Sequence, residues 1–202
     1  MGLILLVVVA AVILWVIFAY NGLISLKNQV VNAWKQIDVQ LKRRHDLIPN
    51  LMDSVKGAMN FERETLDAVI KARNQAIAVT KNAGAGTGLP TAAGVHETAA
   101  AEGQLTAALG RLFAVVEAYP DLKATGNIAQ LQEELTSTEN RIAFSRQMYN
   151  DTATQYNTKL QQVPTNLIAG LANASPAELW EITDVAERAT PKVNLSMQSR
   201  EG

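Results

Sequence analysis

The chain has 202 residues, a formal net charge of −1 and no cysteine. The absence of thiols excludes disulfides, thiolate nucleophiles and thiolate metal sites, and the near-zero charge gives no overall attraction to nucleic acid. Aromatic residues make up only 5% of the chain, and alanine, leucine, glutamine and asparagine dominate its second half. This composition favours an all-α fold.

Residues 3–20 predict a transmembrane anchor, and we assign residues 1–21 to it. The segment contains no charged residue and no proline, and as a helix it is roughly 27 Å long, close to the ~30 Å hydrocarbon core of a bilayer. The alternative is a cleaved secretory signal. Against it, no basic residue precedes the segment, the apolar run is longer than usual, and no small-x-small cleavage site follows.

The basic residues near the anchor all follow it, beginning with Lys27 and Lys35. An excess of Lys and Arg marks the cytoplasmic side of a membrane segment. The sequence therefore favours an N-terminus outside and the remainder of the chain in the cytoplasm.

An amphipathic helix is predicted to continue from the anchor to Arg44. Asp46 then suits the N-cap of a second helix, with Pro49 in its first turn. We expect the chain to turn here and the second helix to reach about Lys81, weakened but not ended by Gly57. The apolar positions of the first helix recur in steps of three and four: Leu23, Leu26, Val30, Ala33 or Trp34, Ile37 and Leu41.

Residues 82–94 are predicted to form a loop, because they contain four glycines and a proline without periodicity. The GAGTG run within them is also the composition of a phosphate-binding loop, but a preceding strand and the Gly-Lys-Ser/Thr spacing are missing. A third helix is expected at 95–118 and a fourth at 127–163, joined by a turn at 119–126. The helical bundle thus spans residues 22–164.

Residues 165–202 are predicted to carry two short helices, 167–172 and 177–188, and a frayed tail from Thr190. Ser175 and Pro176 have the residue types of an N-cap and first helical position for the second of these helices.

The inner stripe of the fourth helix is unusually polar. We expect its hydroxyls to form buried polar layers, bonded to neighbouring helices or to the i−4 carbonyl. Tyr-Asn recurs at a spacing of seven, at Tyr149-Asn150 and Tyr156-Asn157. Core tyrosines are the simpler interpretation, and an asparagine row that fixes register or oligomeric state is the alternative. The candidate polar layers are Thr138, Ser145, Tyr149, Thr152 and Tyr156.

No catalytic or metal-binding constellation is recognisable, and we expect no cofactor. His45 lies at the predicted charged corner, where a surface or capping role is favoured over metal ligation. His96-Glu97 lacks the second histidine of a helical zinc motif. The glutamates of the fourth helix lack the Glu-x-x-His pairs of a bundle metal centre.

The basic corner has two interpretations. It is either a solvated helix end whose cations complement the macrodipole, or a contact for anionic lipid or an acidic partner. A helix places it roughly 35 Å beyond the membrane, which disfavours contact with the parent bilayer. The candidate docking residues are Lys42, Arg43, Arg44, Asp46 and Asn50.

Two long blocks identify the chain as a member of the LemA family of bacterial membrane proteins. They are YNGLISLKNQVVNAWKQIDVQLKRRHDLIPNLMDSVKG from Tyr20 and LTSTENRIAFSRQMYNDTATQYNTKLQQVPTNLIAG from Leu135. The resemblance implies a transmembrane helix that continues into an elongated antiparallel four-helix bundle, and no enzymatic activity. The family usually has His-Glu where this chain has Phe61-Glu62, which removes a candidate metal ligand.

From these features we expect a non-enzymatic scaffold, anchored in the bacterial inner membrane through residues 3–20 and self-associating as a homo-oligomer. The alternative is an accessory or sensor subunit of a membrane enzyme such as a zinc peptidase, with the corner as its docking surface for that membrane protein. No nucleic-acid partner is expected.

Overall fold

The computed structural model describes residues 1–202 except 57–62, 84–87, 120–125, 171, 173 and 182–202. Within these ranges the chain forms five helices and no strand, which confirms the all-α prediction. The helices are α1 (Gly2–Lys56), α2 (Arg63–Ala83), α3 (Ala92–Glu117), α5 (Gly126–Gln161) and α6 (Thr165–Ala169).

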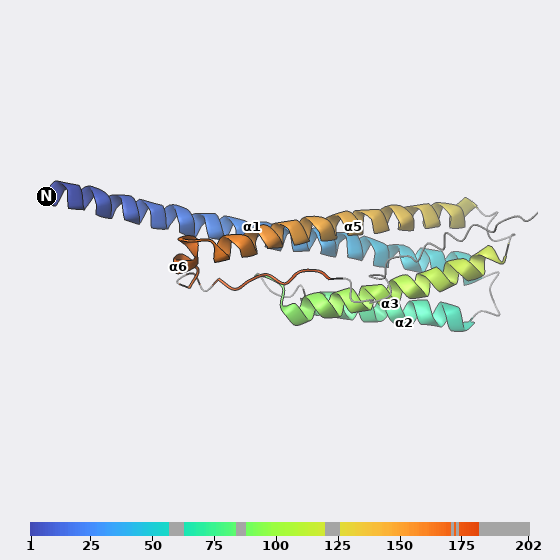
Figure 1. The fold of residues 1–202 in the computed structure, drawn as a ribbon. Coiled ribbons are helices and arrows are strands. Elements are labelled where there is room, and N and C mark those ends of the chain that lie inside the picture. Colours follow the sequence, from blue (N-terminus) through green and yellow to red (C-terminus); the bar gives the residue numbers. More distant parts are fainter. Residues whose placement is uncertain (57–62, 84–87, 120–125, 171, 173, 182–202) are drawn as a thin grey trace, which may run out of the picture.

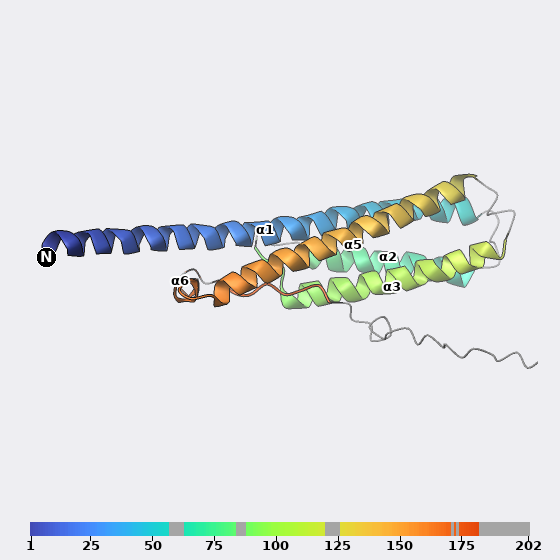
Figure 2. The ribbon, with the colours of Figure 1, turned by 45° about the horizontal axis from the view of Figure 1, so that its top comes forward.

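The bundle is elongated and antiparallel. Figures 1 and 2 show α1 as a long rod whose N-terminal part projects beyond the other helices, with α5 lying along the remainder. α2 and α3 form a second pair that lies alongside the pair of α1 and α5. α1 contacts α5 far more extensively than it contacts α2. The predicted third and fourth helices agree with α3 and α5 to within three residues at each end.

The projecting part of α1 has the properties of a membrane span. Of the described helices, only α1 contains a stretch long and apolar enough to cross a bilayer, and none of that stretch is buried in the protein. The first buried residue of α1 is Leu23. Since so large an exposed apolar surface is unstable in water, a bilayer is the medium that suits it.

The predicted turn near Asp46 is wrong, because α1 continues through Pro49 to Lys56. A proline inside a helix has no N–H to donate to the carbonyl of residue i−4, which here is His45. The Arg73 Nε–H of α2 donates to that carbonyl instead, at 2.7 Å. Asp46 is not an N-cap, and its carboxylate accepts a 2.7 Å hydrogen bond from Lys42 of the same helix.

Two apolar clusters form the core. The membrane-proximal cluster contains α1 from Leu23 to Leu41, together with α5 from Ile142 to Leu160. The distal cluster contains α1 from Ile48 onward, with α2, most of α3 and the start of α5. Each fully buried Leu or Ile contributes roughly 1.5–3 kcal/mol, so both clusters stabilise the bundle strongly.

The segment after α6 differs from the prediction. Residues 174–181 are not helical, so the expected helix at 177–188 is wrong over its described part. They run as an extended segment, here called the strap, whose main chain is bonded to side chains of α5. The expectations for Gly57, residues 182–188 and the tail from Thr190 lie outside the described residues.

Candidate functional site

A buried ion cluster lies between the two apolar clusters. Glu102 of α3 is completely buried, and its Oε1 lies 2.7 Å from His45 Nε2. Arg44 is 3% exposed; its Nη1 lies 3.4 Å from Glu102 Oε2 and 3.1 Å from Glu139 Oε2 of α5. Its Nη2 donates to Thr106 Oγ1 at 2.7 Å. The cluster therefore ties α1, α3 and α5 together at one level.

This arrangement corrects the expected surface roles of Arg44 and His45. Because α1 continues past residue 46, these two positions follow Ile37 and Leu41 along the inner stripe and face the core. A buried charge requires a partner, and Arg44 has its partners Glu102 and Glu139 only where α1, α3 and α5 meet at this level. The sequence prediction missed the cluster because Glu102 lies more than fifty residues away in the chain.

The remaining candidate docking residues are exposed. Lys42, Arg43, Asp46 and Asn50 all lie on the outer surface of α1. The hydrogen bond from Lys42 holds the pKa of Asp46 below its ordinary value. The exposed part of this basic corner, which in the structure is a surface of the continuous helix α1, thus carries one net positive charge, less than the sequence indicated.

The candidate polar layers differ in their surroundings. Thr138 is buried and donates to the Glu134 carbonyl, whereas Thr152 is only partly buried and donates to the Met148 carbonyl. Ala153 occupies the buried position beside Thr152.

The two seam tyrosines are both fully buried, and burial raises the pKa of each phenol. Tyr149 donates to the Glu178 carbonyl of the strap at 2.5 Å. The Tyr156 hydroxyl has no hydrogen-bond partner among the described residues. The prediction that seam hydroxyls bond to a neighbouring helix or to their own helix is thus wrong at Tyr149, whose partner is the strap, and it stays a prediction at Tyr156.

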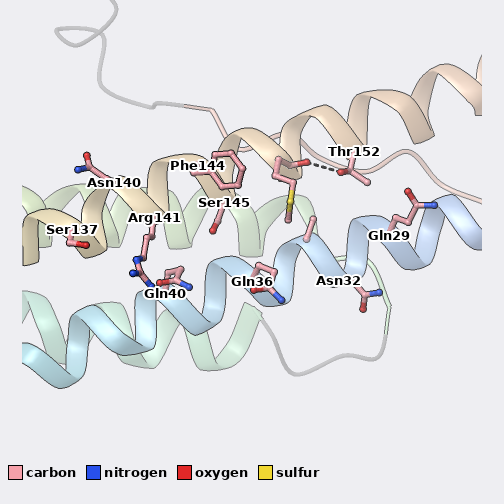
Figure 3. Close-up of a pocket in the computed structure, with 12 residues that line it drawn as sticks. Gln29, Asn32, Gln36, Gln40, Ser137, Asn140, Arg141, Phe144, Ser145 and Thr152 are labelled. Carbon is pink, nitrogen blue, oxygen red and sulfur yellow. Dashed lines mark hydrogen bonds between the residues drawn. The ribbon is translucent and has the colours of Figure 1, made fainter. Parts of the chain in front are cut away.

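A groove of about 920 Å³ runs between α1 and α5. Figure 3 shows the amide side chains of α1 on one wall and residues of α5 on the other. Phe144 is 69% exposed, which is unusual for so large an apolar ring. The lining residues are Gln29, Asn32, Ala33, Gln36, Gln40, Ser137, Asn140, Arg141, Phe144, Ser145, Met148 and Thr152.

The sequence contains a signal for this groove that lies outside the apolar stripe of α1. Gln29, Asn32, Gln36 and Gln40 recur in steps of three and four, so they form a second stripe on α1. Arg141 is the one charged residue of the lining. The groove consequently lacks a paired acid and base and is suited to binding uncharged polar surface and an apolar side chain.

A smaller cavity of about 130 Å³ lies between α1 and the segment that precedes α3. Asp38 lines it, and its Oδ1 has no hydrogen-bond partner among the described residues. Burial raises the pKa of Asp38 to about 6. Within the described ranges, no three His, Asp or Glu side chains converge as metal ligands would.

Comparison with known proteins identifies the family. The LemA family matches residues 33–195, which is most of the chain. The protein belongs to the LemA family. It is 29% identical over 167 residues to protein LemA of Metamycoplasma hominis, covering 82% of this chain and 70% of that protein.

Magnetosome proteins are also similar to this LemA-family chain. Magnetosome protein MamQ 2 of Paramagnetospirillum magneticum is 25% identical over 186 residues, covering 86% of this chain and 68% of that protein. Magnetosome protein MamQ of Magnetospirillum gryphiswaldense is 23% identical over 183 residues, covering 84% and 67%. Together with the exposed apolar span of α1, these relationships indicate a membrane-anchored protein.

Proposed function

We propose that this LemA-family protein is a non-enzymatic membrane scaffold whose copies associate side by side through the groove between α1 and α5. The observation that carries the proposal is the exposed Phe144 ring in an amide-lined groove. Aromatic side chains and methionine are enriched at protein interfaces, and the exposed Phe144 shares this groove with the exposed Met148.

The position of the groove supports association between parallel copies. Its α1 wall, from Gln29 to Gln40, begins about 14 Å and ends about 30 Å beyond Tyr20 along the helix. Two anchored copies related by a twofold axis along the membrane normal present the same residues at the same height. A twofold interface places one surface patch against its own copy, so the two Phe144 rings would enter facing grooves.

The chemistry of the lining also suits a self-complementary contact. A glutamine or asparagine amide both donates and accepts hydrogen bonds, so it pairs with its own kind without charge repulsion. Arg141 is the exception and lies toward the membrane-distal end, near Gln40 and Ser137. The similarity to magnetosome proteins supports a membrane-associated role.

Single-cysteine crosslinking tests the proposal, because the chain has no native cysteine. Gln36→Cys places a thiol in the groove, and Lys35→Cys places one about 100° around the same helix. In vesicles containing the full chain, oxidation should give dimers with Gln36→Cys and few with Lys35→Cys.

Phe144→Ser should reduce the Gln36→Cys crosslinking strongly. Leu167→Ser, at another exposed apolar residue outside the groove, is the matched control and should leave it unchanged. Equal crosslinking at both thiol positions, or no effect of Phe144→Ser, would overturn the proposed interface.

The alternative role, an accessory or sensor subunit of a membrane enzyme that docks on the basic corner, has less support. Arg44 is unavailable to a partner because it is buried with Glu102, and the exposed Lys42 is already paired with Asp46. Charge reversal at Arg43 distinguishes the two roles. The scaffold predicts no change in groove crosslinking, whereas docking predicts loss of a specific partner.

We further propose the bacterial inner membrane as the location, with the bundle in the cytoplasm. The support is the excess of basic residues after the span. Ser25→Cys lies on the exposed surface just beyond the span. Rapid labelling of this thiol in intact cells by an impermeant reagent would show that the bundle lies outside the cytoplasm and would overturn the proposed orientation.

A further inference from the structure

The strap is held to α5 by two asparagines that bond to its main chain. Asn157 Nδ2 donates to the Ala177 carbonyl and its Oδ1 accepts from the Ala177 N–H, both at 2.8 Å. Asn150 makes the same pair of bonds with Trp180, at 2.9 and 2.8 Å. Each amide thus occupies the place that a neighbouring β-strand would take beside an extended chain.

The spacing of the asparagines matches an extended peptide. Seven residues of helix span about 10.5 Å between Asn150 and Asn157, and three extended residues span about 10 Å between Ala177 and Trp180. The two segments run antiparallel, since Asn157 pairs with Ala177 and Asn150 with Trp180. The Tyr149 hydroxyl adds a fifth bond to the strap main chain, at the Glu178 carbonyl.

Two strap side chains fill enclosed positions. Trp180 is buried, with its ring centroid 5.8 Å from that of Trp34, and the Arg146 guanidinium lies 4.7 Å from its ring centroid. Ala177 is also buried, so a larger side chain there would have to displace close-packed neighbours.

A third strap residue makes an exposed polar contact. The Glu178 carboxylate lies 3.3 Å from His96 Nε2 of α3. The specificity of the site therefore rests on the small residue at position 177 and the aromatic residue at position 180, both on an extended backbone.

We propose that this face of the bundle, which we call the strap site, is a peptide-binding site, and that its occupant exchanges between the chain's own strap and that of a neighbouring copy. Asn150 and Asn157 bond to main-chain atoms, which are the same in the chain's own strap and in the strap of another copy. These bonds therefore form equally well with either strap. Recognition of an extended peptide through its main chain, with pockets for alternate side chains, is an established mode of protein binding.

A second copy is the occupant that fits the site best. It carries the same Ala-Glu-Leu-Trp segment at residues 177–180, and parallel anchors hold that segment at the height of the neighbour's site. The exchange rests on the proposed scaffold function in one respect, because it requires that two anchored copies come together in the membrane. It links them through a surface distinct from the groove that contains Phe144.

Two complementary variants test the exchange. Trp180→Ala weakens the strap and keeps Asn150 and Asn157, whereas the double variant Asn150→Ala/Asn157→Ala weakens the site and keeps the strap. Both full-length chains carry Phe144→Ser, so that association through the groove does not contribute, and they are labelled for energy transfer in vesicles. The mixture should associate about tenfold more than either variant alone, since only the mixture contains an intact strap and an intact site.

A labelled synthetic peptide with the sequence of residues 174–181 tests the site without any self-association. It should bind the Trp180→Ala chain, and the two added asparagine substitutions should weaken binding about a hundredfold, because four hydrogen bonds are lost. Asn140→Ala, on the same helix but in the groove, should leave peptide binding unchanged. If Trp180→Ala loses its helical circular dichroism, Ala177→Leu, which retains Trp180, takes its place.

The outcomes separate the two proposals. Peptide binding that is insensitive to Asn150 and Asn157, or no binding to either strap variant, overturns the strap site. Peptide binding without excess association in the mixture overturns exchange between copies. If Gln36→Cys gives no crosslinking but the peptide binds as expected, only the groove interface is overturned, because peptide binding does not depend on the groove.

Discussion

Replacing Glu102 by glutamine tests whether the buried ion cluster stabilises the bundle. Glutamine keeps the shape and one acceptor oxygen, but it removes the charge that faces Arg44 and His45. Among the described residues, Arg44 then retains one ionic partner, Glu139, which is itself 39% exposed. Breaking a buried ion pair from one side costs about 3–5 kcal/mol, so with Glu139 remaining we expect a loss of about 3 kcal/mol in the free energy of unfolding.

The measurement is urea unfolding of the full chain in detergent micelles, followed by far-ultraviolet circular dichroism and by fluorescence after Trp15 of the anchor is replaced by phenylalanine, which leaves Trp34 and Trp180. The transition midpoint should fall while the denaturant slope stays constant, since the same surface is exposed on unfolding. Arg44→Met added to Glu102→Gln should recover part of the loss, because it removes the buried charge that was left underpaired.

Asp46→Asn is the matched control for this prediction. The Lys42–Asp46 pair is on the same helix and is as short as the His45–Glu102 contact, but both of its side chains are exposed. Surface pairs contribute little to stability, so the midpoint should hardly move. If the two substitutions destabilised the bundle equally, burial would not be what determines the cost, and the reasoning would be refuted.

Two other predictions concern α1. Burial raises the pKa of Asp38 to about 6, so the folded state holds this proton more tightly than the unfolded chain. The contribution of Asp38 to stability should therefore fall as pH rises from about 4 to 6. Asp38→Asn should abolish that fall and add roughly 2 kcal/mol at pH 7.5, by urea titration of both chains across this range. Arg73→Met removes the donor to the His45 carbonyl and should cost about 1–3 kcal/mol. In a Pro49→Ala background it should cost much less, because the alanine that replaces Pro49 supplies its own N–H; equal costs in the two backgrounds would contradict this account.

The apolar stripe of α1 was predictable from the sequence, whereas its continuation was not. The predicted stripe from Leu23 to Leu41 is buried at every position except Leu26, which is partly buried. Pro49 was interpreted as the start of a new helix because local rules favour proline there. The donor that compensates for it belongs to Arg73, and no local pattern reveals a partner 28 residues away.

The prediction of a helix in the strap was wrong for a related reason, since the residues that decide its conformation are distant in the sequence. Ser175 and Pro176 have the residue types of a helix start, and the segment that follows contains good helix formers. Four hydrogen bonds between the strap main chain and the side chains of Asn150 and Asn157 favour the extended conformation over that local preference. The seven-residue Tyr-Asn repeat was visible in the sequence, but an asparagine row alone does not reveal which backbone it binds.

The groove, the Asp38 cavity and the strap site all lie in the membrane-proximal half of the bundle. The groove and the Asp38 cavity use α1 before Leu41, and the strap packs on the proximal cluster, which the ion cluster separates from the distal one. We therefore expect substitutions in the distal core to change stability and to leave association through the groove unchanged. Leu105→Ala, in the distal core, should lower the free energy of unfolding by about 2–5 kcal/mol while Gln36→Cys crosslinking stays unchanged wherever the chain remains folded. A parallel loss of crosslinking in the folded protein would show that the two halves are coupled across the ion cluster.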